Sequence, residues 1–171
     1  MPMQWPGFTD DGGLLLPLDA DGLLTTEMPL RLRLDGHVLE RKRELHLTLL
    51  NRRQGQALRD GIGGDRVRAA FESLAWEPRG TGRYALLHKT KDEWDGPLPA
   101  WSVVEHLHEP ALSAFRHLLA EASGLALDSG VPHVTLYVAG DPGGIGVPDI
   151  ATYQACYVRE VDAQELSRHH A

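Results

Sequence analysis

Alternation between apolar and polar residues marks the first regular structure along the chain. Residues 31–34 alternate arginine with leucine, an Asp-Gly pair follows at 35–36, and an apolar run resumes at 37–39. Because Asp-Gly favours the tight turns of β-hairpins, this stretch predicts a hairpin with one solvated face. Residues 44–50 are rich in leucine and end at a polar segment, 51–55, so they predict a buried strand followed by a loop.

Farther along the chain, apolar residues recur every three or four positions, which is the spacing of an amphipathic helix. Apolar positions recur at this spacing over residues 64–76, which predicts an amphipathic helix. A second helix is predicted from Pro110 to Gly124, since proline suits the first turn of a helix and glycine commonly ends one. Its apolar stripe consists of Leu112, Phe115, Leu119 and Ala122.

Four further apolar runs predict strands in the second half of the chain. Residues 84–90 and 101–107 are separated by a charged loop with prolines, and we expect them to pair antiparallel. Residues 131–138 and 153–161 predict the last two strands, with a glycine-rich loop after the first of them. The order of elements predicts an α+β fold with helices packed on antiparallel-rich sheets.

The first 28 residues are unlike the rest of the chain. They are rich in glycine, proline and aspartate without sustained periodicity, so we expect an irregular N-terminal arm at 1–28 and a single domain at 29–171. The apolar run 14–16 is too short for a signal or a membrane span, and no basic segment precedes it. We therefore expect a soluble, cytoplasmic protein without a membrane partner.

Net charge limits the kind of partner. The chain carries −7 with its nine histidines neutral, which argues against an extended cationic surface for a long nucleic acid. The segment from Arg31 to Arg53 nevertheless holds seven basic and three acidic residues, about +4, so a small anionic substrate is compatible with the sequence. The single cysteine, Cys156, excludes an intrachain disulfide framework and a multi-cysteine zinc site.

Two short motifs carry the candidate chemistry. Residues 46–50 are His-Leu-Thr-Leu-Leu and residues 133–137 are His-Val-Thr-Leu-Tyr. Because side chains alternate across a strand, each histidine shares a face with the threonine two residues on, about 7 Å along the strand, while the residue between them faces the core. The two polar pairs are His46 with Thr48 and His133 with Thr135.

The context of these pairs matters more than their number, because nine histidines and eight threonines produce some pairs by chance. A third pair, His88 with Thr90, does occur, but charged residues follow it at the polar end of a predicted strand. The other two motifs lie within apolar strands. Their matched context favours a shared function over two unrelated structural histidines.

With these motifs the sequence resembles the two-histidine (2H) phosphoesterase superfamily, and in particular its RNA 2′,3′-cyclic phosphodiesterase and 2′-5′ ligase-like members. Such proteins carry two His-x-Thr or His-x-Ser motifs on strands of an α+β fold. The resemblance covers about residues 30–161 and aligns the two motifs above with those of the family. It implies a bilobal, pseudo-symmetric fold of two similar lobes, with antiparallel-rich sheets around a central cleft and helices packed outside.

The resemblance also implies a metal-independent phosphodiesterase without a cofactor, which hydrolyses a cyclic phosphate on a nucleotide or an RNA end. Histidine, with an ordinary pKa of about 6.5, can take a proton from water or give one to the leaving oxygen. Threonine hydroxyls can stabilise charge on the phosphate oxygens. The implied catalytic residues are His46, His133, Thr48 and Thr135. Which histidine is the acid, which substrate is physiological, and whether the enzyme hydrolyses or ligates stay open.

Four further residues are candidates for binding the substrate. By strand alternation Tyr137 lies on the motif face and can stack on a base, and Arg53, just past the first motif strand, can reach a phosphate. Tyr84 and His88 share a face of another strand and can line the cleft. A rim aromatic, a solvated arginine and core packing are the structural alternatives for these positions.

Two other functions are compatible with the sequence. A non-catalytic nucleotide- or RNA-binding module would keep the cleft without turnover, and a metal-dependent hydrolase would use the histidines as ligands. The remaining histidines, including His106, His108 and His117, lack carboxylate or cysteine partners at ligand spacing, so no metal site is expected. We expect a monomer whose partner is its nucleotide or RNA-end substrate.

Overall fold

One antiparallel sheet organises the protein. The computed structural model describes residues 2–25 and 27–167, and within them eight strands form a sheet in the order β1-β4-β7-β6-β5-β8, with the β2–β3 hairpin joined to the end of β7. The strands are β1 (Leu14–Leu18), β2 (Arg31–Leu34), β3 (His37–Arg41), β4 (Leu45–Leu50), β5 (Arg79–Glu93), β6 (Gly96–His108), β7 (His133–Ala139) and β8 (Tyr157–Val161).

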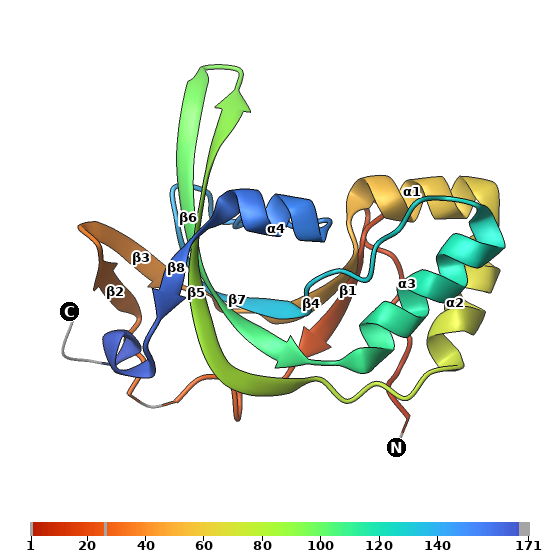
Figure 1. The fold of residues 1–171 in the computed structure, drawn as a ribbon, viewed down its shortest axis with the longest axis horizontal. Coiled ribbons are helices and arrows are strands. Elements are labelled where there is room, and N and C mark those ends of the chain that lie inside the picture. Colours follow the sequence, from red (N-terminus) through yellow and green to blue (C-terminus); the bar gives the residue numbers. More distant parts are fainter. Residues whose placement is uncertain (1, 26, 168–171) are drawn as a thin grey trace.

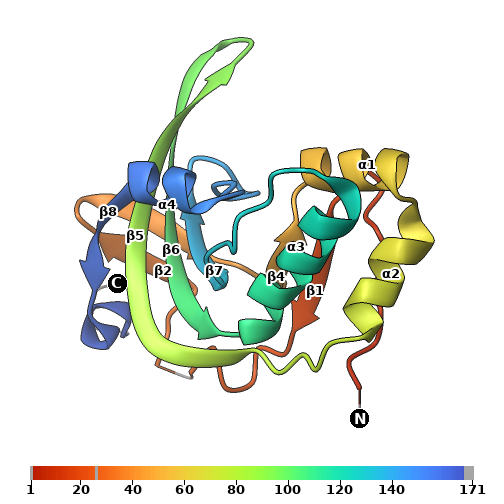
Figure 2. The same cartoon turned by 45° about the vertical axis from the view of Figure 1, so that its right-hand side comes forward.

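Helices pack on both faces of this sheet (Figures 1 and 2). Helices α2 and α3 bury Phe71 and Phe115 in the main core, which also contains Leu47 of β4. The short helix α4 packs on a smaller core. Val103 belongs to the main core and its neighbour Val104 to the smaller one, so the two cores lie on opposite faces. The helices are α1 (Arg52–Gly61), α2 (Gly64–Glu72), α3 (Pro110–Ser123), α4 (Ile150–Cys156) and the 3₁₀ helix η1 (Ala163–Leu166).

Turn and cap residues act where the sequence predicted them. Asp35 and Gly36 both have positive φ, 51° and 81°, as the tight turn between β2 and β3 requires. Helix α3 begins at Pro110 and its C-cap, Gly124, adopts the left-handed conformation with φ 74°. The pairing of β5 with β6 is antiparallel, as expected. The coarse prediction of an α+β fold with an antiparallel-rich sheet is therefore confirmed.

The N-terminal arm is more regular than its composition predicted. Residues Leu14–Leu18 form β1, which pairs antiparallel with β4, and Leu14 and Leu16 are buried. The partner of this strand lies about thirty residues farther along the chain. Its leucines owe their burial to that distant pairing, which local periodicity does not reveal.

Two helices occupy segments predicted as a loop and a strand. The polar segment after β4 begins α1, because the side chain of Asn51 accepts from the amide of Gln54 and the Gln54 side chain accepts from the amide of Asn51. Residues 150–156 form α4, capped by the side chain of Asp149, and the last predicted strand is shortened to β8. In both places a side-chain cap decides the local conformation.

Strands β5 and β6 extend beyond the sheet as a protruding hairpin, residues 88–100 (Figure 1). Their pairing continues to Glu93 and Gly96, whereas β8 pairs with β5 only as far as Leu87 and β7 pairs with β6 only from Trp101. The charged segment predicted as a loop is thus mostly strand. No helix in the described part of the chain is long and apolar enough to cross a membrane.

Candidate functional site

The pairing of β4 with β7 brings the two motifs together. Leu47 is registered opposite Val134 in this antiparallel pair, so one step along each strand places His46 opposite Thr135 and Thr48 opposite His133. Residues opposite each other in a sheet point to the same face. The two histidines and two threonines therefore form a block of four on one face, which we call the motif block.

The motif block is accessible, whereas the residues between its members are not. Leu47 and Val134 are 1% and 0% exposed in the main core, and all four members of the block are half-buried on the other face. Directly opposite Cβ atoms in a sheet are about 4.5–5.5 Å apart and diagonal ones about 7–8 Å. His46 and His133 are diagonal neighbours, so their rings can reach a small group placed between them.

His133 is held in one orientation and one tautomer. Its Nδ1 lies 2.7 Å from the carbonyl oxygen of Val131, and a carbonyl can only accept, so Nδ1 carries a proton and donates it. The neutral ring therefore has its lone pair on Nε2. Burial lowers the pKa of His133 below its usual value, the bond to Val131 opposes this, and positive charge on His106 and His46 lowers it further.

His46 has a different environment. Burial lowers its pKa, the cationic side chain of Lys42 adds to this effect, and Glu44 opposes it. Among the described residues its imidazole has no hydrogen-bond partner. Both motif histidines thus favour the neutral form at neutral pH, but only the ring of His133 is fixed by a hydrogen bond.

A third histidine extends the site. His106 of β6 is registered opposite His133, so Thr48, His133 and His106 form one row across three strands. Its Nε2 lies 2.6 Å from the hydroxyl oxygen of Tyr153 on α4, and the two rings meet edge to face. Sequence reasoning missed this pair because it depends on the register between β6 and β7. The only sequence signal is the position of His106 next to the apolar run of β6.

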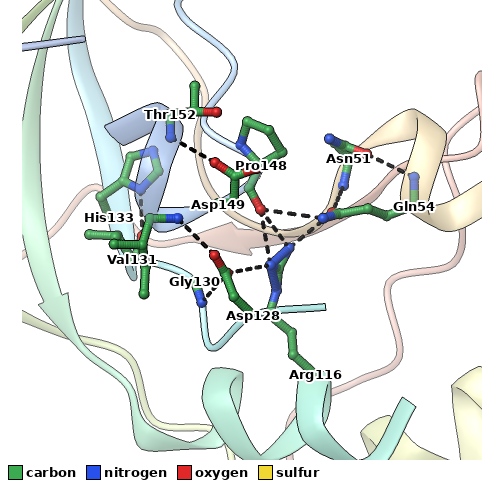
Figure 3. A network of polar contacts seen from close by, with 11 residues as sticks. Asn51, Gln54, Arg116, Asp128, Gly130, Val131, His133, Pro148, Asp149 and Thr152 are labelled. Carbon is green, nitrogen blue, oxygen red and sulfur yellow. Dashed lines mark hydrogen bonds and ion pairs between the residues drawn. The ribbon is translucent and has the colours of Figure 1, made fainter. Parts of the chain in front are cut away.

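A polar network supports the His133 side of the block (Figure 3). Arg116 of α3 is buried and donates to the carbonyl oxygen of Pro148 at 3.1 Å and to the side-chain oxygen of Gln54 at 2.9 Å. Asp128 accepts from the amides of Gly130 and Ile150. The network joins α1, α3, the segment before β7 and the segment before α4.

The loop between β7 and α4 lies close to the block. A Cβ atom at Gly144 would be 3.6 Å from the Thr135 methyl group and from the buried hydroxyl of Ser102, and Gly144 has φ +80°. A Cβ atom would fit at these distances, so it is the left-handed backbone that favours glycine at this position of the loop. Lys91 holds the same loop through Asp141 and the carbonyl oxygen of Gly144.

Tyr137 does not lie on the motif face, contrary to the sequence prediction. The register of β7 against β6 shifts by one residue, from Val104 opposite Thr135 to Val103 opposite Tyr137. This bulge reverses the alternation, so Tyr137 is buried in the main core and donates to the carbonyl oxygen of Pro29 at 2.7 Å. Burial raises its pKa to about 12.

The other three residues predicted to bind substrate have different surroundings. Tyr84 is buried in the main core, on the opposite face of the sheet. His88 stacks on Trp101, which also packs against the main core. Arg53 lies in the first turn of α1 and is exposed, so a role in binding stays a prediction.

No member of the motif block lines one of the five surface cavities or belongs to a metal-binding group among the described residues. These cavities have volumes of about 240 to 590 Å³ and are lined by other residues. Within residues 2–25 and 27–167, no three His, Cys, Asp or Glu side chains are grouped to hold a metal ion.

Comparison with family models, with curated proteins and with solved structures gave no match for the chain.

Proposed function

We propose that the protein is a metal-independent phosphodiesterase that hydrolyses a cyclic phosphate, on a 2′,3′-cyclic nucleotide, an RNA terminus or a related cyclic nucleotide. The observation that carries the proposal is the motif block: two His-x-Thr motifs on adjacent antiparallel strands present two imidazoles and two hydroxyls on one accessible face. The proposal includes the two-lobed architecture of the 2H phosphoesterases, with α1 to α3 on one lobe and α4 on the other.

The geometry favours His133 as the general base. Its Nδ1 is committed to Val131, so the Nε2 lone pair is free to take a proton from water as the water oxygen bonds to phosphorus. The bond from phosphorus to the 2′ or 3′ oxygen breaks, and the protonated ring of His46 gives its proton to that oxygen. A phosphate bound beside His46 raises the pKa of this imidazole, which supplies the protonated form.

The threonines suit the role of phosphate ligands. Each is the cross-strand neighbour of the histidine from the other motif, so a phosphate between the imidazoles has a hydroxyl donor on both sides. Thr48 also borders β1, because it is registered opposite Leu15. Both hydroxyls stand on strands held by the main core, which fixes their positions.

The test is a screen of cyclic-phosphate substrates in EDTA, from mononucleotides to oligonucleotides that end in a 2′,3′-cyclic phosphate. We expect turnover by the wild type and a loss of about 10²–10⁴ in kcat/KM for His46→Ala and for His133→Ala. The control is His117→Ala, since His117 is an exposed histidine on α3 paired with Glu121. Full activity of His133→Ala, or activity that requires added zinc, would contradict the proposal.

A binding module without turnover is the second candidate, and it is favoured by the imidazole of His46, which no hydrogen bond from the described residues orients for proton transfer. Calorimetry separates the two functions. Saturable binding of a 2′,3′-cyclic nucleotide that depends on Thr48 and Thr135, with no product after prolonged incubation, would support the binding module.

A further inference from the structure

The tip of the protruding hairpin exposes a tryptophan among carboxylates. Trp94 is 100% exposed and lies in the two-residue turn that joins β5 to β6. Asp92, Glu93 and Asp95 surround it in sequence and are also exposed, and within the described residues none of the three forms a salt bridge. A large aromatic side chain in this position is unusual for a free surface and typical of an anchor in an interface.

A basic cavity on another part of the molecule has the complementary character. It has a volume of about 490 Å³ and lies where β3 ends, before β4. Its wall includes Leu30, which is 70% exposed. Its charged lining residues are Arg31, Arg41, Lys42, Arg43 and Glu40.

Charge singles out this cavity among the five. It has four cationic side chains and one carboxylate. The cavity beside Trp5 has two arginines and one aspartate, and the other three have no excess of cations. Trp94 and Leu30 are also the two most exposed large apolar residues in the described part of the chain. One stands on an acidic tip and the other in a basic cavity.

We propose that the hairpin tip of one copy of the chain docks into the basic cavity of a second copy. Trp94 covers Leu30, and the three carboxylates of the tip meet the arginines and the lysine of the cavity. Two copies related by a two-fold axis make this contact twice and form a closed dimer. This proposal differs from the monomer expected from the sequence and is independent of the proposed function.

The contact is small and charged, so its strength depends on concentration and salt. A hairpin tip buries less surface than a standard interface, which predicts reversible association. We expect sedimentation equilibrium in about 0.05 M NaCl to show the average mass rising with concentration from one chain of 18.9 kDa toward two, and about 0.5 M NaCl to weaken the association.

Two variants test the two halves of the contact. Trp94→Ala removes the anchor and Arg43→Glu reverses a charge in the cavity, and each should weaken self-association at least about 30-fold. Controls with matched chemistry are Tyr157→Ala, another exposed aromatic, and Arg66→Glu, an exposed arginine on α2. Circular dichroism checks that every variant is folded.

Mixing the variants gives the sharpest result. Trp94→Ala retains an intact cavity and Arg43→Glu retains an intact tip, so an equimolar mixture should form heterodimers through one intact contact and associate more strongly than either variant alone. A wild type that is monomeric at all concentrations in low salt, a dimer that both variants leave unchanged, or a mixture that associates no more strongly than either variant alone would overturn the proposal.

Discussion

The two motif strands carry the same three-residue pattern in different surroundings. On β4, His46 is bordered by Lys42 and β1, and its imidazole has no hydrogen-bond partner among the described residues. On β7, His133 is bound to Val131 and stands in a row with His106. A motif defines which groups are present, but the neighbouring strands define which proton each ring holds.

Mutation of the two motif histidines should have its largest effect on turnover. Replacing either histidine with alanine should lower kcat/KM by about 10²–10⁴, because each removes one proton-transfer group. The two variants should differ in their pH profiles: His133→Ala loses the limb that reports the base, and His46→Ala loses the limb that reports the acid. Steady-state kinetics across pH measures this. Identical profiles would remove the assignment of His133 as base.

The reverse side of the block should matter for stability rather than for chemistry. Leu47→Ala opens a cavity in the main core and should lower the free energy of unfolding by about 2–5 kcal/mol. Val134→Ala should have a smaller effect because it removes fewer atoms. Urea denaturation measures both, with Leu125→Ala, 37% exposed, as the control within about 0.5 kcal/mol of wild type. Equal effects of Leu47→Ala and the control would contradict the burial.

The network beside β7 should stabilise only one of the two motifs. Arg116→Met keeps the length of the side chain but removes its bonds to Pro148 and Gln54, which should lower the free energy of unfolding by about 1.5–3 kcal/mol. Hydrogen exchange should increase in residues 128–150 and stay unchanged in β1. An equal increase in hydrogen exchange in residues 128–150 and in β1 would contradict the prediction that the network stabilises only the β7 motif. Arg66→Met is the matched surface control.

Acid should weaken the fold through the histidines of the site. The pKa values of His46, His106 and His133 are all lowered in the folded protein, chiefly by burial. The unfolded chain then binds more protons than the folded one as pH falls below about 6.5, so the free energy of unfolding falls from about pH 7 to pH 5. Urea midpoints across this range measure it. His133→Gln should reduce the pH dependence of the free energy of unfolding more than His117→Gln does. A free energy of unfolding that rises from pH 7 to pH 5 would contradict the prediction.

The smallest expected effect concerns the row of histidines. His106→Gln removes a positive charge that disfavours protonation of His133, so the pKa of His133 should rise. Proton NMR of the imidazole Cε1 hydrogen measures this value in each protein. Tyr153→Phe is the partner variant, because it removes the hydroxyl at Nε2 of His106 but leaves the ring in place. An unchanged pKa of His133 in His106→Gln would show that the two rings do not interact, and a lower pKa would contradict the predicted sign.

Local signals predicted much of the fold. The turn at Asp35 and Gly36, the start of α3 at Pro110 and its end at Gly124 follow from the preferences of single residues. The strand phase around His46 and His133 also follows from the sequence, because burial of the residue between histidine and threonine requires it.

The remaining features depend on distant pairing and on caps. The bulge that turns Tyr137 into the core arises between β6 and β7 and leaves no mark in the sequence of β7 alone. His106 joins the row only through the register with His133. Asn51 and Asp149 begin helices by side-chain bonds, where composition indicated a loop and a strand. Contacts between segments therefore decide which side chains surround the two motifs.

Strand β1 has one further consequence, which concerns aggregation. Without it, β4 would be an edge strand with free backbone groups beside His46, and such edges recruit strands from other chains. Strand β1 is the edge strand instead, and its exposed Pro17 has no amide hydrogen to donate to a strand from another chain. A residue that obscured the strand in the sequence thus protects the sheet from uncontrolled growth.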